Sequence, residues 1–289
     1  ADGTSITIIM EETDRISAIE QSATPGGDGT PLVVDVLSNA VFDLATNPSL
    51  ASLKIAVTEF ADVVDPFVLG ASLDYNSGII TLNISERIDV TPASGIDVSK
   101  LFLSNSSGAN NIQLSAADLQ TSTDDTIISI KISEQSRALA IAISGTPGGD
   151  TKAAFLDVSA IFMHDIGLVD NRIQNGILLL ESPDVTPPSF ISGSISYDDS
   201  INGGGRQIVL TMSETIDLTP LSLVNTSCFV LSEDGSNTPI VVLHGATALG
   251  SDGTSLTIQI SEAHRVAAVL ASGTPGGDGS GVKLNILKG

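Results

Sequence analysis

Cysteine and aromatic residues are scarce in this chain, and each scarcity excludes a class of structure. One cysteine, Cys228, occurs in 289 residues, so a disulfide framework is excluded. Its apolar neighbours predict a buried thiol on a strand. Tryptophan is absent and aromatic residues make up 3% of the chain, so the core must consist of Ile, Leu, Val and Ala. The many Ser, Thr, Asn, Asp and Gly residues suit strands joined by polar turns.

Basic residues are also few. The chain has 12 Lys and Arg against 34 Asp and Glu, which gives a formal net charge of −22. This excess of negative charge argues against nucleic acid or an anionic membrane as a partner. It favours divalent cations or a salty medium, with simple solubility of a surface protein as the plainer alternative. No apolar run reaches membrane-spanning length, so we expect no membrane-spanning segment.

Motifs for catalysis and nucleotide binding are missing too. The glycine-rich stretches at 26–29 and 203–205 lack the strand–loop–helix context and the lysine of a phosphate-binding loop. No histidine has a second His or Cys at metal-binding spacing, and no Gly-x-Ser-x-Gly nucleophile elbow occurs. We therefore predict no catalytic residue, no site for an organic cofactor and no enzymatic activity.

The chain does contain a long repeat. The loop Thr-Pro-Gly-Gly-Asp occurs three times, at 24–28, 146–150 and 274–278. One arginine also returns in each copy: Arg15, Arg137 and Arg265. The period is 122 residues between the first two copies and 128 between the last two, because six extra residues fall in a loop around 203–205. Tandem units of this kind usually span distance or present copies of one surface.

Two short acidic segments that end in proline mark the domain boundaries, Glu59–Pro66 and Glu181–Pro188, and they resemble semi-rigid hinges. We predict the second part of a repeat unit over residues 1–65 and a complete unit over 66–187. A third unit, which lacks its last strand or strands, is predicted over 188–289. Two explanations remain open: the chain is a window of a longer array, or a strand donated by a neighbouring copy completes the open unit.

Alternation of apolar and polar residues with period two predicts strands at 6–10, 80–84, 128–132, 208–212 and 256–260. Short apolar segments predict further strands at 32–36, 54–57, 101–104, 155–158, 177–180, 229–232 and 240–243. One short helix is expected in each unit, where Ser133 and Ser261 can cap the first turn and a glutamate can pair with the arginine three residues later. We therefore predict an all-β fold of tandem β-sandwiches, each with about seven strands and one short α-helix.

Two segments carry a resemblance to a known family. Residues 187–217 combine a Pro-Pro start, a tyrosine with a polar turn, and a strand that ends in Ser213-Glu214-Thr215-Ile216-Asp217. Residues 41–48 resemble a Val-x-Asp-x-Ala-Gly-Asn segment, with Thr46 in place of the glycine, while the counterpart at 165–171 looks two residues longer. These features resemble the bacterial-type Ig-like repeats of prokaryotic surface-layer and giant cell-surface proteins. The acidic, lysine-poor composition looks most like the archaeal members.

The resemblance implies tandem Ig-like β-sandwich domains and an extracellular, structural role at the cell surface. In that role, copies of the chain would assemble into a surface layer or a filament. The alternative is the stalk of a cell-surface adhesin that carries a separate binding domain.

Acidic residues concentrate at the predicted domain junctions. Ca²⁺ takes six to eight oxygen ligands from carboxylates, backbone carbonyls and water, so it is the cofactor that this pattern favours. The candidate ligands at the junctions are Glu59, Asp62, Asp65, Glu181 and Asp184. Loops of neighbouring units add Asp43, Asp89, Asp165 and Asp170. Because no Asp-x-Asp-x-Asp-Gly loop is present, solvated acidic hinges remain the alternative.

Three Asn-x-Ser/Thr sequons are candidate glycosylation sites: Asn83, Asn105 and Asn225. Asn83 is the most informative, because Leu82 and Ile84 on either side of it are expected to face the core. A glycan on Asn83 would therefore meet solvent in an extracellular, glycosylating host.

Overall fold

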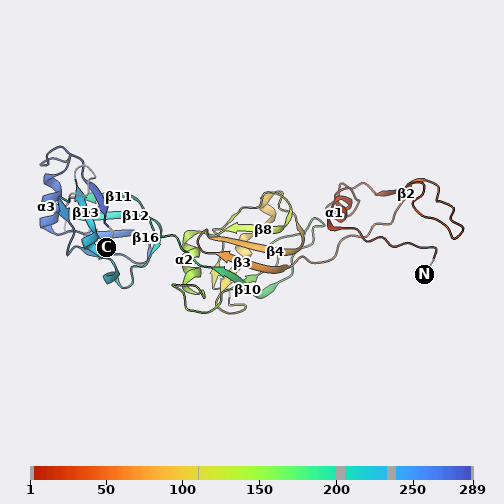
Figure 1. The fold of residues 1–289 in the computed structure, drawn as a ribbon, viewed down its shortest axis with the longest axis horizontal. Coiled ribbons are helices and arrows are strands. Elements are labelled where there is room, and N and C mark those ends of the chain that lie inside the picture. Colours follow the sequence, from red (N-terminus) through yellow and green to blue (C-terminus); the bar gives the residue numbers. More distant parts are fainter. Residues whose placement is uncertain (1–2, 110, 199–205, 233–238, 288–289) are drawn as a thin grey trace. The chain divides into compact units, whose positions relative to one another are not determined.

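The structure is a computed structural model that describes residues 3–109, 111–198, 206–232 and 239–287 (Figure 1). It consists mostly of β-strands, as the sequence predicts, and it divides into two compact units, Ala1–Val185 and Thr186–Gly289. The three α-helices span nine residues each, and within the described part of the chain no helix is long and apolar enough to cross a membrane.

One eight-stranded sheet forms the larger part of the first unit, in the order β6-β5-β9-β10-β3-β4-β8-β7. Its strands are β3 (Val68–Asp74), β4 (Ile79–Ile88), β5 (Leu101–Ser104), β6 (Ile112–Gln113), β7 (Asp118–Leu119), β8 (Asp125–Lys131), β9 (Phe155–Val158) and β10 (Gln174–Ser182). Two 3₁₀ turns, η1 (Ala93–Gly95) and η2 (Val98–Lys100), precede β5. All neighbouring strands are antiparallel except β10 and β3, which run parallel.

The core of this unit lies between the two halves of the sheet. Leu82 on β4 and Ile128 on β8 pack in one buried cluster with Leu101 on β5 and Leu156 on β9. Each of these aliphatic side chains contributes about 1.5–3 kcal/mol by its removal from water. Strand β10 joins the halves, because it pairs with β9 on one side and β3 on the other.

The second unit repeats this arrangement in two separate sheets. A four-stranded sheet has the order β11-β12-β16-β15, and a three-stranded sheet has the order β14-β13-β17. The strands are β11 (Phe190–Ser196), β12 (Gln207–Ile216), β13 (Phe229–Ser232), β14 (Val241–Val242), β15 (Thr247–Leu249), β16 (Gly253–Gln259) and β17 (Lys283–Ile286). The 3₁₀ turns η3 (Leu221–Leu223) and η4 (Thr226–Cys228) precede β13. One buried cluster, which includes Leu210, Leu231 and Ile258, lies between the sheets.

Cys228 does not have the place that the sequence predicts. It lies at the end of η4 and is partly exposed, so the expectation of a buried strand thiol is wrong. The side chain of Asn225 accepts a hydrogen bond from Ser227 N and so holds the turn, which delays the start of the strand to Phe229.

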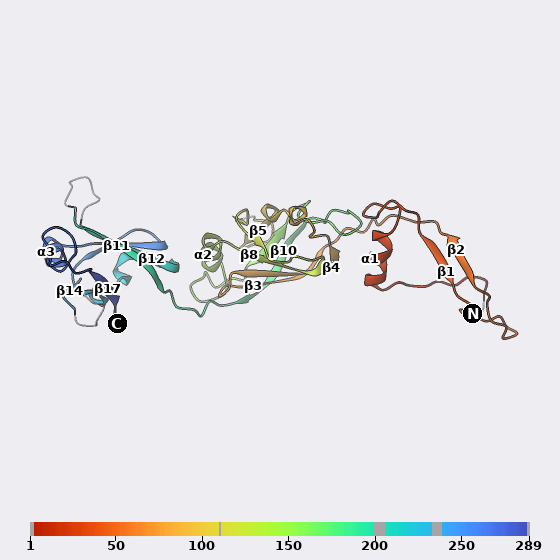
Figure 2. The ribbon, with the colours of Figure 1, turned by 90° about the horizontal axis from the view of Figure 1, so that it is seen from above.

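The three helices occupy equivalent places in the repeat: α1 (Glu12–Glu20), α2 (Glu134–Ala142) and α3 (Glu262–Leu270). The predicted caps of α2 and α3 are confirmed, since Ser133 Oγ accepts from Ser136 N at 3.1 Å and Ser261 Oγ accepts from His264 N at 3.2 Å. Within the first unit, α2 lies at one end of the strands β3 and β4, and α1 lies beyond the other end (Figures 1 and 2).

Residues 3–65 hold α1 and a two-stranded ribbon of β1 (Val33–Val36) and β2 (Ser52–Ala56). The predicted strand at 6–10 is wrong: these residues form no strand, and Ile6, Ile8 and Met10 are exposed. The physical reason is the lack of a partner. In the middle of the chain the counterpart strand β8 pairs with β4, whereas no strand in the described part of the chain pairs with residues 6–10.

Candidate functional site

The arginine that recurs in each repeat is the centre of a network at α1. Arg15 binds both carboxylate oxygens of Glu12 at 2.8 Å, and it also pairs with Asp62 and, at 3.0 Å, with Glu86 Oε2. Arg137 on α2 does the same with Glu134 and Asp184. The predicted ion pairs between helical glutamate and arginine are therefore confirmed.

The predicted junction glutamates close the loop that follows each helix. Glu59 accepts hydrogen bonds from Ala23 N at 2.9 Å and Leu32 N at 2.5 Å. Glu181, its counterpart on β10, accepts from Gly145 N at 3.2 Å and Ala154 N at 3.3 Å. The Tyr75 hydroxyl also donates to Glu181, at 2.7 Å. These two carboxylates therefore bind backbone and hydroxyl donors of their own repeat unit.

Residues 3–65 meet the rest of the first unit in a tight contact, which we call the junction. A Cβ added to Gly26 would lie 1.9 Å from the carbonyl oxygen of Ile166, and one added to Gly167 would lie 2.8 Å from the Cβ of Asp62. Arg87 N donates to Glu12 Oε1 at 3.2 Å across the same contact. A side chain has no room at Gly26 because of the Ile166 backbone, and none at Gly167 because of the Asp62 side chain.

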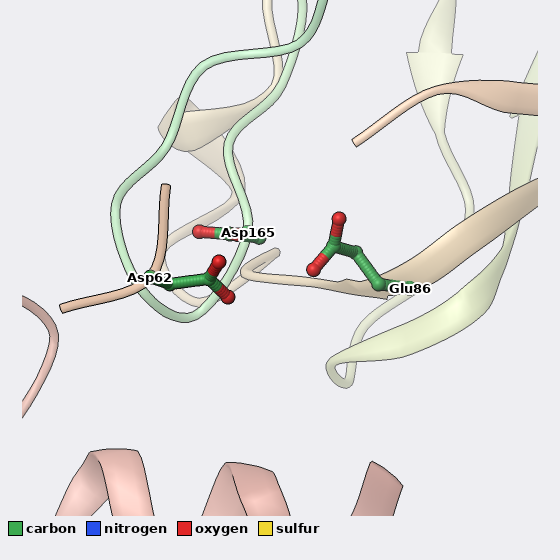
Figure 3. Close-up of side chains that lie close together, drawn as sticks. All are labelled: Asp62, Glu86 and Asp165. Atoms are coloured by element: carbon green, nitrogen blue, oxygen red, sulfur yellow. The ribbon is translucent and has the colours of Figure 1, made fainter. Parts of the chain in front are cut away.

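Three carboxylates come together at the junction, and we call them the acidic cluster: Asp62, Glu86 and Asp165 (Figure 3). Each offers one carboxylate oxygen, and these oxygens lie within 4.8 Å of one another. Asp62 comes from the segment after β2, Glu86 from β4, and Asp165 from the loop between β9 and β10. Oxygen ligands from three segments are an arrangement suited to a hard divalent cation.

Asp165 is the deepest member of the acidic cluster. Its residue is fully buried, and its Oδ1 accepts a hydrogen bond from Val169 N at 2.8 Å. Its Oδ2 is buried without a hydrogen-bond partner. A buried carboxylate oxygen that accepts no hydrogen bond destabilises the folded chain, and a bound cation would offset that cost. Asp165 Oδ2 is therefore a candidate metal ligand.

Burial and like charge shape the acid–base behaviour of the cluster. Burial, with the nearby Asp165 and Asp62 carboxylates, raises the pKa of Glu86 to about 7 against the opposing effect of Arg15. Burial likewise raises the pKa of Asp165, although the hydrogen bond from Val169 N opposes the rise. The pKa of Glu12 is lowered, chiefly by its hydrogen bonds to Arg15. Arg15 alone therefore does not balance the negative charge of the cluster.

The sequence predicted two members of the cluster and missed the third. Glu86 belongs to a Ser-Glu pair that returns as Ser213-Glu214, and it lies two positions from Ile84 and from Ile88, whose side chains face the core. A glutamate on the core face of a strand is the signal that could have identified it. Among the described residues, no other group of three acidic or metal-binding side chains comes together.

The other predicted ligands lie elsewhere. Asp65 and Asp170 are outside the acidic cluster, as are Glu59, Glu181 and Asp184. Asp89 accepts from Thr91 N at 2.9 Å, and its Oδ2 lies 3.6 Å from His164 Nε2.

Asp43 closes an exposed turn of its own, which is the counterpart of the turn that begins at Asp165. Its Oδ1 accepts from Asn47 N at 2.8 Å, and the equivalent bond joins Val169 N to Asp165. Isolated bridges flank both turns at the same spacing, Phe42 with Pro48 and His164 with Asp170. The expectation that the segment at 165–171 is two residues longer is therefore wrong, because the two turns have equal length.

The three sequons differ in exposure. Asn83 is exposed on β4 between buried neighbours, so its predicted direction is confirmed. Asn225 is exposed but uses its side chain to hold η4, and Asn105 is only partly exposed. Glycosylation itself stays a prediction at all three.

Comparisons with family models and with curated proteins found no match: no family model matches the chain, and no curated protein matches it significantly.

Proposed function

We propose that this chain is a structural, extracellular repeat module of a surface layer or surface filament, built from Ig-like β-sandwich domains and partnered by copies of itself. The observation that carries the proposal is the junction, where two successive repeat units are joined by ion pairs and by close backbone packing. Arg15 of one unit pairs with Glu86 of the next, and Gly26 packs directly against Ile166. A contact of this kind supports an array that holds its shape under load.

The Ig-like assignment rests on the middle of the chain. Two groups of mainly antiparallel strands enclose one aliphatic core, and a short helix connects one group to the other. That is the general plan of a β-sandwich. The parallel pairing of β10 with β3 lets the last strand complete the sandwich beside the first.

The stiffness of the junction can be measured in the full chain. Spin labels on Ser17 and Ser115, which are both exposed, would report the distance across the junction in a Cys228→Ser background. We expect a single narrow distance distribution, which broadens in Arg15→Ala because the bridge to Glu86 is lost. Lys152→Ala, which alters an exposed ion pair on the surface, is the control and should leave the distribution narrow. A broad distribution in the unaltered chain would contradict the proposal.

We also propose that the acidic cluster binds Ca²⁺. The unpartnered Asp165 Oδ2 supports this, and so does the pKa of Glu86, which is raised by burial and by the neighbouring Asp165 and Asp62 carboxylates. A bound cation would complete the oxygen ligands with water and backbone carbonyls and would tighten the junction.

Isothermal titration calorimetry with CaCl₂ tests the cation site. We expect saturable binding that becomes at least about tenfold weaker in Asp165→Asn, because one charged ligand is lost. Asp43→Asn is the matched control, since Asp43 closes the same turn outside the cluster, and it should bind as the unaltered chain does. Equal binding by all three proteins, or no saturable heat at millimolar Ca²⁺, would contradict the site.

A further inference from the structure

Arg15 contacts two of the three carboxylates of the acidic cluster. Its Nη2 donates to Glu86 Oε2 at 3.0 Å, and its Nη1 pairs with Asp62 Oδ2. Asp62 and Glu86 belong to different segments, and their side chains extend toward each other (Figure 3). One planar guanidinium group therefore holds both carboxylates in a fixed relation, which the single ammonium group of a lysine does not do.

Arg15 is itself held in place by Glu12, three residues earlier on α1. Arg15 Nε donates to Glu12 Oε2 and Arg15 Nη2 donates to Glu12 Oε1, both at 2.8 Å. A bidentate pair of this kind fixes the plane of the guanidinium group. Glu12 Oε1 also accepts from Arg87 N at 3.2 Å, so the backbone of β4 fixes the glutamate in turn. The folded chain therefore sets the orientation of Arg15 without a bound ion.

The carboxylates of Glu86 and Asp165 each have one oxygen bound by the protein and one that remains for another ligand. Glu86 Oε2 accepts from Arg15, and among the described residues no donor reaches Glu86 Oε1. Asp165 Oδ1 accepts from Val169 N at 2.8 Å, while the buried Oδ2 has no hydrogen-bond partner. Carboxylates that are held at one oxygen present the other oxygen in a defined direction.

Asp62 follows the same division with one addition. Its Oδ2 pairs with Arg15, and its Oδ1 accepts one hydrogen bond, from Val64 N at 3.0 Å. A carboxylate oxygen has two lone pairs, so Asp62 Oδ1 can bind a cation and keep the bond from Val64 N. All three carboxylates can therefore offer an oxygen to one ion while the protein holds the other oxygen.

We propose that Arg15 is the positioning residue of the cation site. It holds Asp62 and Glu86 by one oxygen each and so orients their other oxygens, together with Asp165 Oδ2, toward a bound Ca²⁺. The inference rests on the cation site proposed above and assigns the residue that builds it. Because the positive charge of Arg15 by itself disfavours a cation, a test of positioning must keep the charge and remove the geometry.

The chain contains a matched control for this test on α2. Arg137 binds Glu134 through the same pair of hydrogen bonds, at 2.7 and 2.9 Å, and it pairs with Asp184. Asp184 lies outside the acidic cluster. A substitution of Arg137 therefore alters the same kind of helical ion pair without touching a member of the cluster.

Isothermal titration calorimetry of the full chain with CaCl₂ compares Arg15→Lys with Arg137→Lys. We expect about tenfold weaker binding in Arg15→Lys, because lysine keeps the charge but does not hold both carboxylates, and the loss of a group that orients metal ligands typically has this effect. Arg137→Lys should bind Ca²⁺ as the unaltered chain does.

Glu12→Asp tests the same geometry from the other side of Arg15. Aspartate keeps the negative charge but is too short to form the same bidentate pair, so Arg15 loses its fixed orientation and Ca²⁺ should bind more weakly. Glu134→Asp makes the equivalent change on α2 and should leave the affinity for Ca²⁺ unaltered.

Luminescence of bound Eu³⁺ distinguishes positioning from a general effect on stability. The lifetimes in H₂O and D₂O give the number of water molecules on the ion. We expect about one more water in Arg15→Lys than in the unaltered chain, because water replaces a carboxylate oxygen that has turned away. Arg137→Lys should keep the water number of the unaltered chain.

The outcomes separate this inference from the cation site itself. Equal or tighter Ca²⁺ binding in Arg15→Lys would overturn the positioning role and leave the site in place, and tighter binding would mean that Arg15 and the ion compete for the same oxygens. An unchanged water number in Arg15→Lys would also overturn the positioning role. No saturable heat in the unaltered chain would overturn the cation site and the positioning role together.

Discussion

At the scale of single residues, Glu86 determines how the junction responds to pH. Its pKa of about 7 in the folded chain lies above the value of 4.5 for a free glutamate, because burial and two neighbouring carboxylates disfavour its charge. The folded chain therefore binds more protons than the unfolded chain between about pH 4.5 and pH 7. Linkage then requires that stability falls as pH rises through this window.

Glu86→Gln tests this linkage. The unaltered chain should lose up to about 3 kcal/mol of stability between pH 4.5 and pH 8 from this residue, and the variant should lose less, since the amide does not ionise. Urea unfolding, followed at several pH values without divalent cations, measures the difference. Glu20→Gln, on an exposed position of α1, is the control and should keep the full pH dependence. An equally steep loss in Glu86→Gln would contradict the assignment.

Gly26 and Gly29 form a natural pair of test positions for the junction. Both have positive φ, +87° and +83°, so alanine strains the backbone at each by about 1–2 kcal/mol. A Cβ on Gly26 also collides with Ile166 O, whereas a Cβ on Gly29 meets nothing within 4 Å. Gly26→Ala should therefore broaden the spin-label distance across the junction, and Gly29→Ala should not. Equally narrow spin-label distance distributions in the two variants would show that the contact between Gly26 and Ile166 is not needed for a stiff junction.

At the scale of elements, much of the strand pattern follows from sequence and the exceptions have clear physical causes. Period-two alternation identified β4, β8, β12 and β16 because each buries one face. The same alternation at 6–10 predicted a strand that does not form. Alternation gives a segment one apolar face, but a strand also needs a neighbouring strand to pair with. Asp62 and Asp165 were predictable as junction acids. Glu86 joined them only through tertiary contact, which a linear pattern does not encode.

Strand β10 depends on Glu181, the carboxylate that ties it to the loop after α2. Glu181→Ala removes hydrogen bonds from Tyr75 Oη, Gly145 N and Ala154 N, and it leaves the buried Tyr75 hydroxyl with the longer bond to Ala140 O at 3.5 Å. We expect a loss of about 2–5 kcal/mol in the urea unfolding of the first unit. The matched change Glu59→Ala removes only two backbone bonds and should cost less. A larger loss in Glu59→Ala would contradict the role given to the tyrosine.

At the scale of the whole molecule, the repeat, the acidic composition and the junction support one account. In the first two repeat units an arginine pairs with a glutamate of its helix and with a junction aspartate, and a junction glutamate closes the loop after the helix. Arg15 extends this network to Glu86 of the following unit. A protein with these features is suited to act joined to copies of itself.

Electron microscopy of the concentrated chain, with Ca²⁺ and with a chelator, tests this account most directly. The account predicts filaments or lattice patches with a regular spacing in Ca²⁺, and less order when the chelator removes the cation. Isolated monomers under both conditions would contradict it.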